Sequence, residues 1–299
     1  MAEEKAYNPS TVLCAVDFSE ESRLALKYAG IGAKLYGAKL IVLHAQRFEL
    51  PAYFTPDQIE TLRKQLDSAR AGAEDFLRHY SRSALGPLVD SLPTTYKVVD
   101  QHPVDAILET TSSEGANLVV LGTHGRGGAT RLWLGSVAEN IATHSEVPVF
   151  VVRQKQHEFI DVANPESPLR LRTIIAPVDF SETSRAVLRV SVSIAERFEA
   201  KVVPVCVVRG DAADNLRNSE AVLHEWLGQV HASRCIVESV TRVGHAAEQI
   251  LSLINETKAD LAVLGAENSR STGRPLLGRT TKLVLRQAPV PVLVVPPGA

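Results

Sequence analysis

Val16-Asp17-Phe18-Ser19-Glu20 occurs a second time in the chain, as Val178-Asp179-Phe180-Ser181-Glu182, at an offset of 162 residues. Two later segments recur at an offset of 143 residues: Asn117–Gly122 as Asp260–Gly265, and Val147–Val152 as Val290–Val295. The offset changes once, so the second copy is shorter by 19 residues, which we place between its second and third strands. Self-similarity over this length predicts a duplicated domain, not one large domain.

Each copy alternates short apolar segments with longer amphipathic ones. In the first copy we expect strands at Thr11–Val16, Lys39–Ala45, Thr95–Val99, Leu118–Gly122 and Val149–Val152, and helices at Glu20–Leu35, about Pro56–Tyr80, Val104–Ser113 and Ser136–His144. The second copy repeats this order, with strands at 173–178, 201–207, 236–243, 261–265 and 292–295 and helices at 182–198, 214–230, 246–257 and 280–287. Apolar strands separated by helical periods are typical of a parallel sheet covered on both faces. We therefore predict two α/β domains, residues 1–153 and 171–299, joined by a linker at 154–170 that contains Pro165 and Pro168.

The composition excludes several classes of protein. The 299 residues are 45% apolar and 22% charged, which is typical of soluble globular proteins and long enough for two domains. A net charge of −2 offers no basic footprint for nucleic acid or an anionic membrane, and no apolar run is long enough to span a bilayer. Cys14, Cys206 and Cys235 are not spaced for disulfides or zinc, and Met1–Lys5 has no signal-peptide pattern. We expect a cytoplasmic protein with no nucleic-acid or membrane partner and no protein-bound metal.

Small residues follow the fourth strand of the first copy, at the edge where open α/β sheets bind ligands. Gly122 and Gly125 lie in this segment, and Gly135-Ser136-Val137 opens the next helix. Backbone N–H groups at a helix N-terminus favour an anion such as phosphate. The charges of Arg126 and Arg131, in the same segment, are near enough to add to such a site.

The same residues also allow readings without a ligand. Ser136 and Glu139 have the spacing of a capping box, which would only start a helix. Ser19 is expected to cap the helix after Asp17 in any case, and His44 suits a satisfied core group better than a metal ligand. Neither the P-loop pattern nor the glycine pattern of dinucleotide-binding proteins is present, so a P-loop NTPase and a dehydrogenase are disfavoured.

The spacing Gly122-x2-Gly125-x9-Gly135-Ser136 resembles the G-2x-G-9x-G-[S/T] nucleotide-binding signature of the universal stress protein family. Val16–Ser19 looks like that family's first-strand ending and Val147–Val152 like its last strand, so the resemblance spans Thr11–Arg153 and, more weakly, Leu171–Pro297. It implies two tandem Rossmann-like (adenine nucleotide alpha hydrolase-like) domains, each with five parallel strands in the order 3-2-1-4-5. It also implies a stress-response role and ATP bound across the ends of strands one and four.

The resemblance assigns residues of the first copy to parts of the nucleotide. Asp17 and Ala15 would border the adenosine, and Ala45 would contact the base. The residues implied around the ribose and phosphates are Leu121, Gly122, His124, Gly125 and Arg126, with Gly135, Ser136 and Val137 holding the phosphates. Mg²⁺, if involved, would arrive with the triphosphate and not in a protein cage.

The second copy departs from this signature. Gly265 and Gly278 keep the spacing, but Asn268 replaces the second glycine and Arg279 replaces the Ser/Thr. A weaker second site would use Pro177, Asp179, Val207, Gly265, Gly278 and Thr280. The alternatives are a side-chain anion site formed by Arg279 with Arg270 and Arg274, or a loop that has lost its ligand. We favour the absence of an intact ATP site here.

The last strand of each copy, Val149–Val152 and Val292–Val295, follows a proline and suits a sheet edge. The resemblance implies that such strands pair across a dimer, so we expect a pseudo-dimer within one chain, with a homodimer of whole chains also open. For function we favour regulatory ATP binding, because no dedicated base for hydrolysis is evident and Asp17, the only nearby acid, suits a nucleoside contact better. A slow ATPase and a nucleotide-free interaction scaffold are the alternatives.

Overall fold

The computed structural model describes residues 6–45, 72–123, 134–153, 159–161, 164, 167, 169–208, 213–229, 235, 238–268 and 275–298. The first half contains β1 (Thr11–Ala15), α1 (Glu20–Tyr36), β2 (Lys39–Ala45), a helix at 72–85, the 3-10 helix η1 (Gly86–Ser91), β3 (Thr94–Val99), α3 (Pro103–Ser113), β4 (Leu118–Gly122), α4 (Ser136–His144) and β5 (Val149–Val152). The second half contains β6 (Thr173–Val178), α5 (Glu182–Phe198), β7 (Lys201–Val208), α6 (Ala213–Gln229), β8 (Val240–Val243), α7 (Ala246–Thr257), β9 (Leu261–Gly265), β10 (Glu267–Asn268), β11 (Pro275–Leu276), α8 (Arg279–Gln287) and β12 (Val292–Val295).

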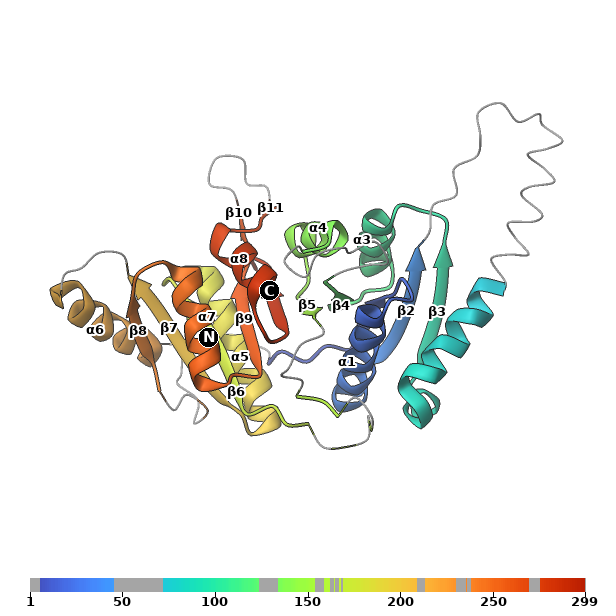
Figure 1. Cartoon of the computed structure of the whole chain (residues 1–299), viewed down its shortest axis with the longest axis horizontal. Helices are drawn as coiled ribbons and strands as arrows, with labels where there is room; N and C mark the ends of the chain where they lie inside the picture. Colours follow the sequence, from blue (N-terminus) through green and yellow to red (C-terminus); the bar gives the residue numbers. More distant parts are fainter. Residues whose placement is uncertain are drawn as a thin grey trace, which may run out of the picture.

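Ten strands form one continuous sheet in the order β3-β2-β1-β4-β5-β12-β9-β6-β7-β8 (Figure 1). All neighbours within each half are parallel, so each half has the order third, second, first, fourth, fifth. β5 and β12 are antiparallel to each other, with Phe150 opposite Leu293. The predicted α/β class and the predicted pairing of the two last strands within one chain are confirmed.

Consecutive strand residues point to opposite sides of the sheet. Because consecutive residues of these strands are apolar, both faces of the sheet are apolar. In β1, Cys14 belongs to one core cluster and Leu13 to the other, and both are fully buried. The helices α1, 72–85, α5 and α6 cover the first face, and α3, α4, α7 and α8 cover the second. Both clusters run through the two halves without a break, so the halves share their hydrophobic core.

Helices α1 and α5 begin in the same way. Ser19 and Ser181 are their N-caps, and each side chain accepts a hydrogen bond from the backbone N–H three residues later. The predicted capping role of Ser19 is therefore confirmed. α1 ends at Gly37, which has φ 65, a left-handed conformation that glycine adopts without cost.

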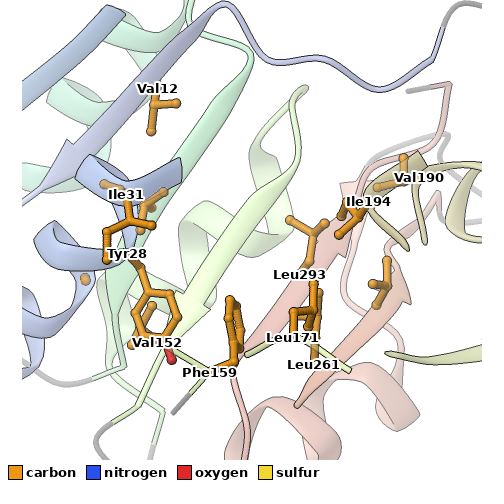
Figure 2. Packing of buried hydrophobic residues seen from close by; sticks show 14 of the residues in the cluster. Val12, Tyr28, Ile31, Val152, Phe159, Leu171, Val190, Ile194, Leu261 and Leu293 are labelled. Carbon is orange, nitrogen blue, oxygen red and sulfur yellow. The ribbon is translucent and has the colours of Figure 1, made fainter. Parts of the chain in front are cut away.

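The segment predicted as a linker contributes to the core in its described part. Phe159 and Ile160 are buried, and the Phe159 ring packs against Tyr28 of α1 with 4.9 Å between ring centroids. Figure 2 shows Tyr28 and Phe159 facing Leu171, Leu261 and Leu293 across the junction of the halves. The segment therefore packs the two halves together instead of only spacing them.

Several element boundaries differ from the sequence prediction. Of the helix expected at about 56–80, residues up to 71 lie outside the described part, and the described helix runs on to residue 85. The strand expected at 236–243 is described at Val240–Val243. The ribbon of β10 and β11 was not predicted, because the glycine spacing indicated a loop after β9.

Candidate functional site

The sheet topology brings part of the predicted first site to one edge. Ala15, Ala45 and Gly122 are the last residues of β1, β2 and β4, and these strands run parallel, so their carboxyl ends meet. Asp17 follows β1 and is half-buried at the same edge, whereas the Leu121 side chain is buried in the second core cluster. His124, Gly125 and Arg126 lie outside the described residues.

A short turn holds Asp17 in place. Its Oδ1 accepts hydrogen bonds from the backbone N–H of Ser19 at 3.1 Å and from the Ser19 hydroxyl at 2.6 Å. Phe18 has φ 64, and this left-handed conformation is unusual for a bulky residue. Its ring packs at 4.4 Å from the His44 ring and 5.2 Å from the Tyr80 ring, measured between centroids. Packing therefore compensates a strained turn that fixes the carboxylate at the strand end.

His44 has a structural role, as predicted. It is buried, and its Nδ1 donates to the carbonyl oxygen of Val16 at 2.8 Å.

Among the residues that the structure describes, no group of three or more His, Cys, Asp or Glu side chains is placed to hold a metal ion. No helix in that part of the chain is long and apolar enough to cross a membrane.

The N-terminus of α4 differs from the sequence prediction in its cap. Gly135 is the N-cap and Ser136 the first helical residue, so the capping-box reading of Ser136 is wrong. The N–H of Gly135 donates to the carbonyl oxygen of Thr123 at 2.6 Å, so in this structure the amide is bonded within the chain. No side chain of the described residues caps this helix, and the first-turn amides of Ser136 and Val137 have no partner within the helix itself.

Two glycines of the pattern are required by helix packing. A Cβ at Gly122 would lie 2.9 Å from the Cβ and 3.0 Å from the backbone carbonyl carbon of Glu21 in α1. A Cβ at Gly265 would lie 2.5 Å from Cγ2 of Thr183 in α5. In both halves the missing side chain therefore lets the first helix approach the fourth strand, a reason that the sequence analysis did not give.

The second half contains a cavity of about 140 Å³ at the corresponding edge. Five of the six residues predicted for the weaker second site line it: Pro177, Asp179, Val207, Gly265 and Thr280. The sixth, Gly278, is the N-cap of α8, and a Cβ built on it would lie 3.5 Å from Oε1 of Glu267, which does line the cavity. The structure thus brings the predicted second-site residues together around one concave surface.

Asp179 is held in this cavity by three hydrogen bonds. Its Oδ1 accepts hydrogen bonds from the Ser181 N–H at 3.1 Å, the Ser181 hydroxyl at 2.6 Å and the Ser184 hydroxyl. Burial alone raises the pKa of the Asp179 carboxyl, but these donors outweigh it and hold the pKa below its usual value. The side chain is therefore a carboxylate at neutral pH.

Two residues of this edge were missed from the sequence. Glu267 lines the cavity, and it aligns with His124 of the first half at the 143-residue offset, so aligning the copies position by position would have identified it. The hydroxyl of Thr281 donates to the carbonyl oxygen of Gly265 at 2.9 Å, tying α8 to the end of β9. Arg279, by contrast, is exposed and is not part of the cavity lining.

Comparison with protein-family models matches residues 9–153, and again 170–296, to the universal stress protein family. The chain belongs to the universal stress protein family. Its two matched segments correspond to the two halves of the sheet, which makes it a tandem member.

Individual universal stress proteins agree with this result. A universal stress protein of Thermus aquaticus is 32% identical over 145 residues, which cover 48% of this chain and 98% of that protein. One of Mycobacterium tuberculosis is 32% identical over 147 residues, which span 48% of this chain and about half (45%) of that relative. The solved universal stress protein of Archaeoglobus fulgidus superposes with a TM-score of 0.60 at 23% identity, over 96% of each chain, and this likeness shows the fold.

Proposed function

We propose that this universal stress protein binds ATP in its first half and that nucleotide occupancy regulates a stress response in the cytoplasm. The observation that carries the proposal is the N-terminus of α4, which has no side-chain cap among the described residues and lies where a glycine signature of nucleotide-binding members is expected. Family membership supports the same assignment. We also propose the domain boundaries expected from the sequence, 1–153 and 171–299.

The described residues at this edge fit an adenine nucleotide. The amides of Ser136 and Val137 face outward at a helix N-terminus, where the macrodipole favours a phosphate. Asp17 is fixed by Ser19 at the end of β1, where a carboxylate accepts hydrogen bonds from sugar hydroxyls. Ala15 and Ala45 are small, half-buried residues at the same edge, where we place the nucleoside. The bound triphosphate supplies its own Mg²⁺, which needs no protein cage.

Binding is favoured over hydrolysis by the chemistry of the same residues. Hydrolysis of ATP needs a group that orients or deprotonates the attacking water and a positive charge that stabilises the transferring phosphoryl group. Asp17 is oriented by two hydrogen bonds on Oδ1, which suits a carboxylate that positions a hydroxyl. We therefore propose a binding protein that responds to ATP without consuming it.

The test places a negative charge where the phosphates are proposed to bind. Ser136→Glu adds a carboxylate to the first turn of α4, where acidic residues stabilise a helix, so the fold is expected to tolerate it. Calorimetry should show about one ATP bound per chain. The affinity for ATP should be at least tenfold weaker in Ser136→Glu and unchanged in the matched second-half variant Arg279→Glu. Equal ATP affinity in Ser136→Glu and the unmodified chain contradicts the proposal, and phosphate release above a buffer blank supports the ATPase alternative.

A further inference from the structure

The cavity of the second half combines an apolar wall with two carboxylates. Val205, Val207, Ile250 and Leu264 provide apolar surface, and Asp179 lies among the polar residues of the lining. Glu267 adds the second carboxylate, and the described lining contains neither lysine nor arginine. We infer that this cavity binds an uncharged nucleoside and excludes the phosphorylated forms of the same nucleoside. The inference rests on the proposed function in treating the two halves as related sites, and it assigns them different ligands.

Asp179 supplies the recognition of sugar hydroxyls. Its three hydrogen bonds from Ser181 and Ser184 all reach Oδ1, and Oδ2 is the oxygen that we assign to the ligand. A carboxylate only accepts hydrogen bonds, and the two neighbouring hydroxyls of ribose both donate. A carboxylate at the end of a strand in an α/β sheet binds ribose hydroxyls in this way. The apolar wall then lies beside it for the flat base.

Glu267 places a negative charge beside the position that a phosphate would take. Its Oε1 and Oε2 lie 3.5 Å and 3.8 Å from the position of a Cβ built on Gly278, the N-cap of α8. The carboxylate thus lies beside the helix N-terminus that, in α4 of the first half, is proposed to hold the phosphates. A phosphate there would meet a like charge at short range, which costs binding energy that an uncharged ligand does not lose. At the aligned position the first half has His124, so this obstacle is specific to the second copy.

The primary test titrates adenosine into the full chain in excess ATP, which fills the first-half site. One adenosine per chain is expected, with affinity at least tenfold weaker in Asp179→Asn. The matched control is Asp105→Asn, an exposed aspartate of α3 outside both sites, and its affinity should stay within twofold of the unmodified chain. Thermal unfolding confirms that both variants are folded. Absence of adenosine binding, or equal adenosine affinity in Asp179→Asn and the unmodified chain, overturns the inference.

Glu267 is tested with AMP and ATP as probes. Glu267→Gln keeps the side-chain size and removes the charge, so AMP and ATP should bind the second half about fivefold more tightly while adenosine binding stays within twofold. Glu267→His installs the residue of the first half and should have the same direction of effect. A second ATP bound to the unmodified chain as tightly as adenosine overturns the charge argument.

A local signal separates this inference from the proposed function. The centroid of the Trp226 ring lies 5.8 Å from the centroid of the Phe180 ring, and Phe180 directly follows Asp179 in the sequence. The chain has one other tryptophan, Trp133. In Trp133→Phe the remaining fluorescence reports the second half and should change with adenosine. Failure of the proposed function leaves that adenosine signal and removes ATP binding, whereas failure of the present inference leaves ATP binding and removes the adenosine signal.

Discussion

Gly122 shows how a residue in a ligand-binding pattern can be required by packing. It ends β4, and a Cβ there would lie 2.9–3.0 Å from side-chain and backbone atoms of Glu21. The backbone of α1 cannot yield as the tip of a flexible side chain can, so the helix must move. The glycine spacing singles out Gly122 at the end of β4, but the packing reason for this glycine needs the path of α1, which no local pattern contains.

We expect Gly122→Ala to lower the free energy of unfolding by about 1–3 kcal/mol, the usual cost of overpacking. Gly32→Ala is the matched control, because a Cβ at Gly32 meets nothing within 4 Å and alanine is the better helix former in α1. It should leave stability unchanged or raise it by up to about 1 kcal/mol. Urea unfolding measures both, and equal effects of the two substitutions would contradict the packing argument.

At the scale of elements, amphipathic periods predicted most helices and strands. α4 was predicted at its observed bounds, Ser136–His144, but its cap was misassigned. The cap depends on the carbonyl of Thr123, which accepts the Gly135 N–H, and that contact follows from how the chain returns after β4. Where the capping partner is local, as for Ser19 at the start of α1, the sequence was sufficient.

The two serine caps give a prediction at this scale. Ser19→Ala removes the acceptor for the Ser22 N–H and one of the two donors to Asp17, so α1 should lose about 1 kcal/mol. Ser181→Ala removes the equivalent bonds of α5 and should cost a similar amount. Chemical unfolding gives the values. A Ser19→Thr variant keeps the hydroxyl and should stay within about 0.5 kcal/mol of the unmodified protein; a loss as large as that of alanine would refute the capping role.

At the scale of the whole molecule, pairing of β5 with β12 joins the halves into one sheet, and it was predicted from the two apolar final strands together with the family resemblance. The side chains that lie across this junction were not predictable. Glu139 of α4 forms ion pairs with Lys282 and with Arg286 (3.0 Å) of α8, and Arg153 donates to backbone carbonyls in the last turn of α8. In sequence Glu139, Lys282 and Arg286 are ordinary charged helix residues and Arg153 follows a strand, and only the antiparallel pairing of the last strands brings them together.

Glu139 therefore gives a pH-dependent prediction for the junction. Burial raises the pKa of its carboxyl, but Lys282 and Arg286 outweigh burial and hold the pKa below its usual value. A carboxyl whose pKa is lowered on folding stabilises the fold above its unfolded pKa of about 4.3, and the contribution disappears as pH falls through the folded value.

Glu139→Gln should therefore cost about 1 kcal/mol at pH 7 and much less near pH 3, as measured by urea unfolding at both pH values. The control is Glu182→Gln, because Glu182 is 93% exposed and pairs with Arg185 at 3.4 Å. Its effect should stay within about 0.5 kcal/mol at either pH. A cost for Glu139→Gln that is the same at pH 7 and pH 3 would mean that charge at this position does not hold the two halves together.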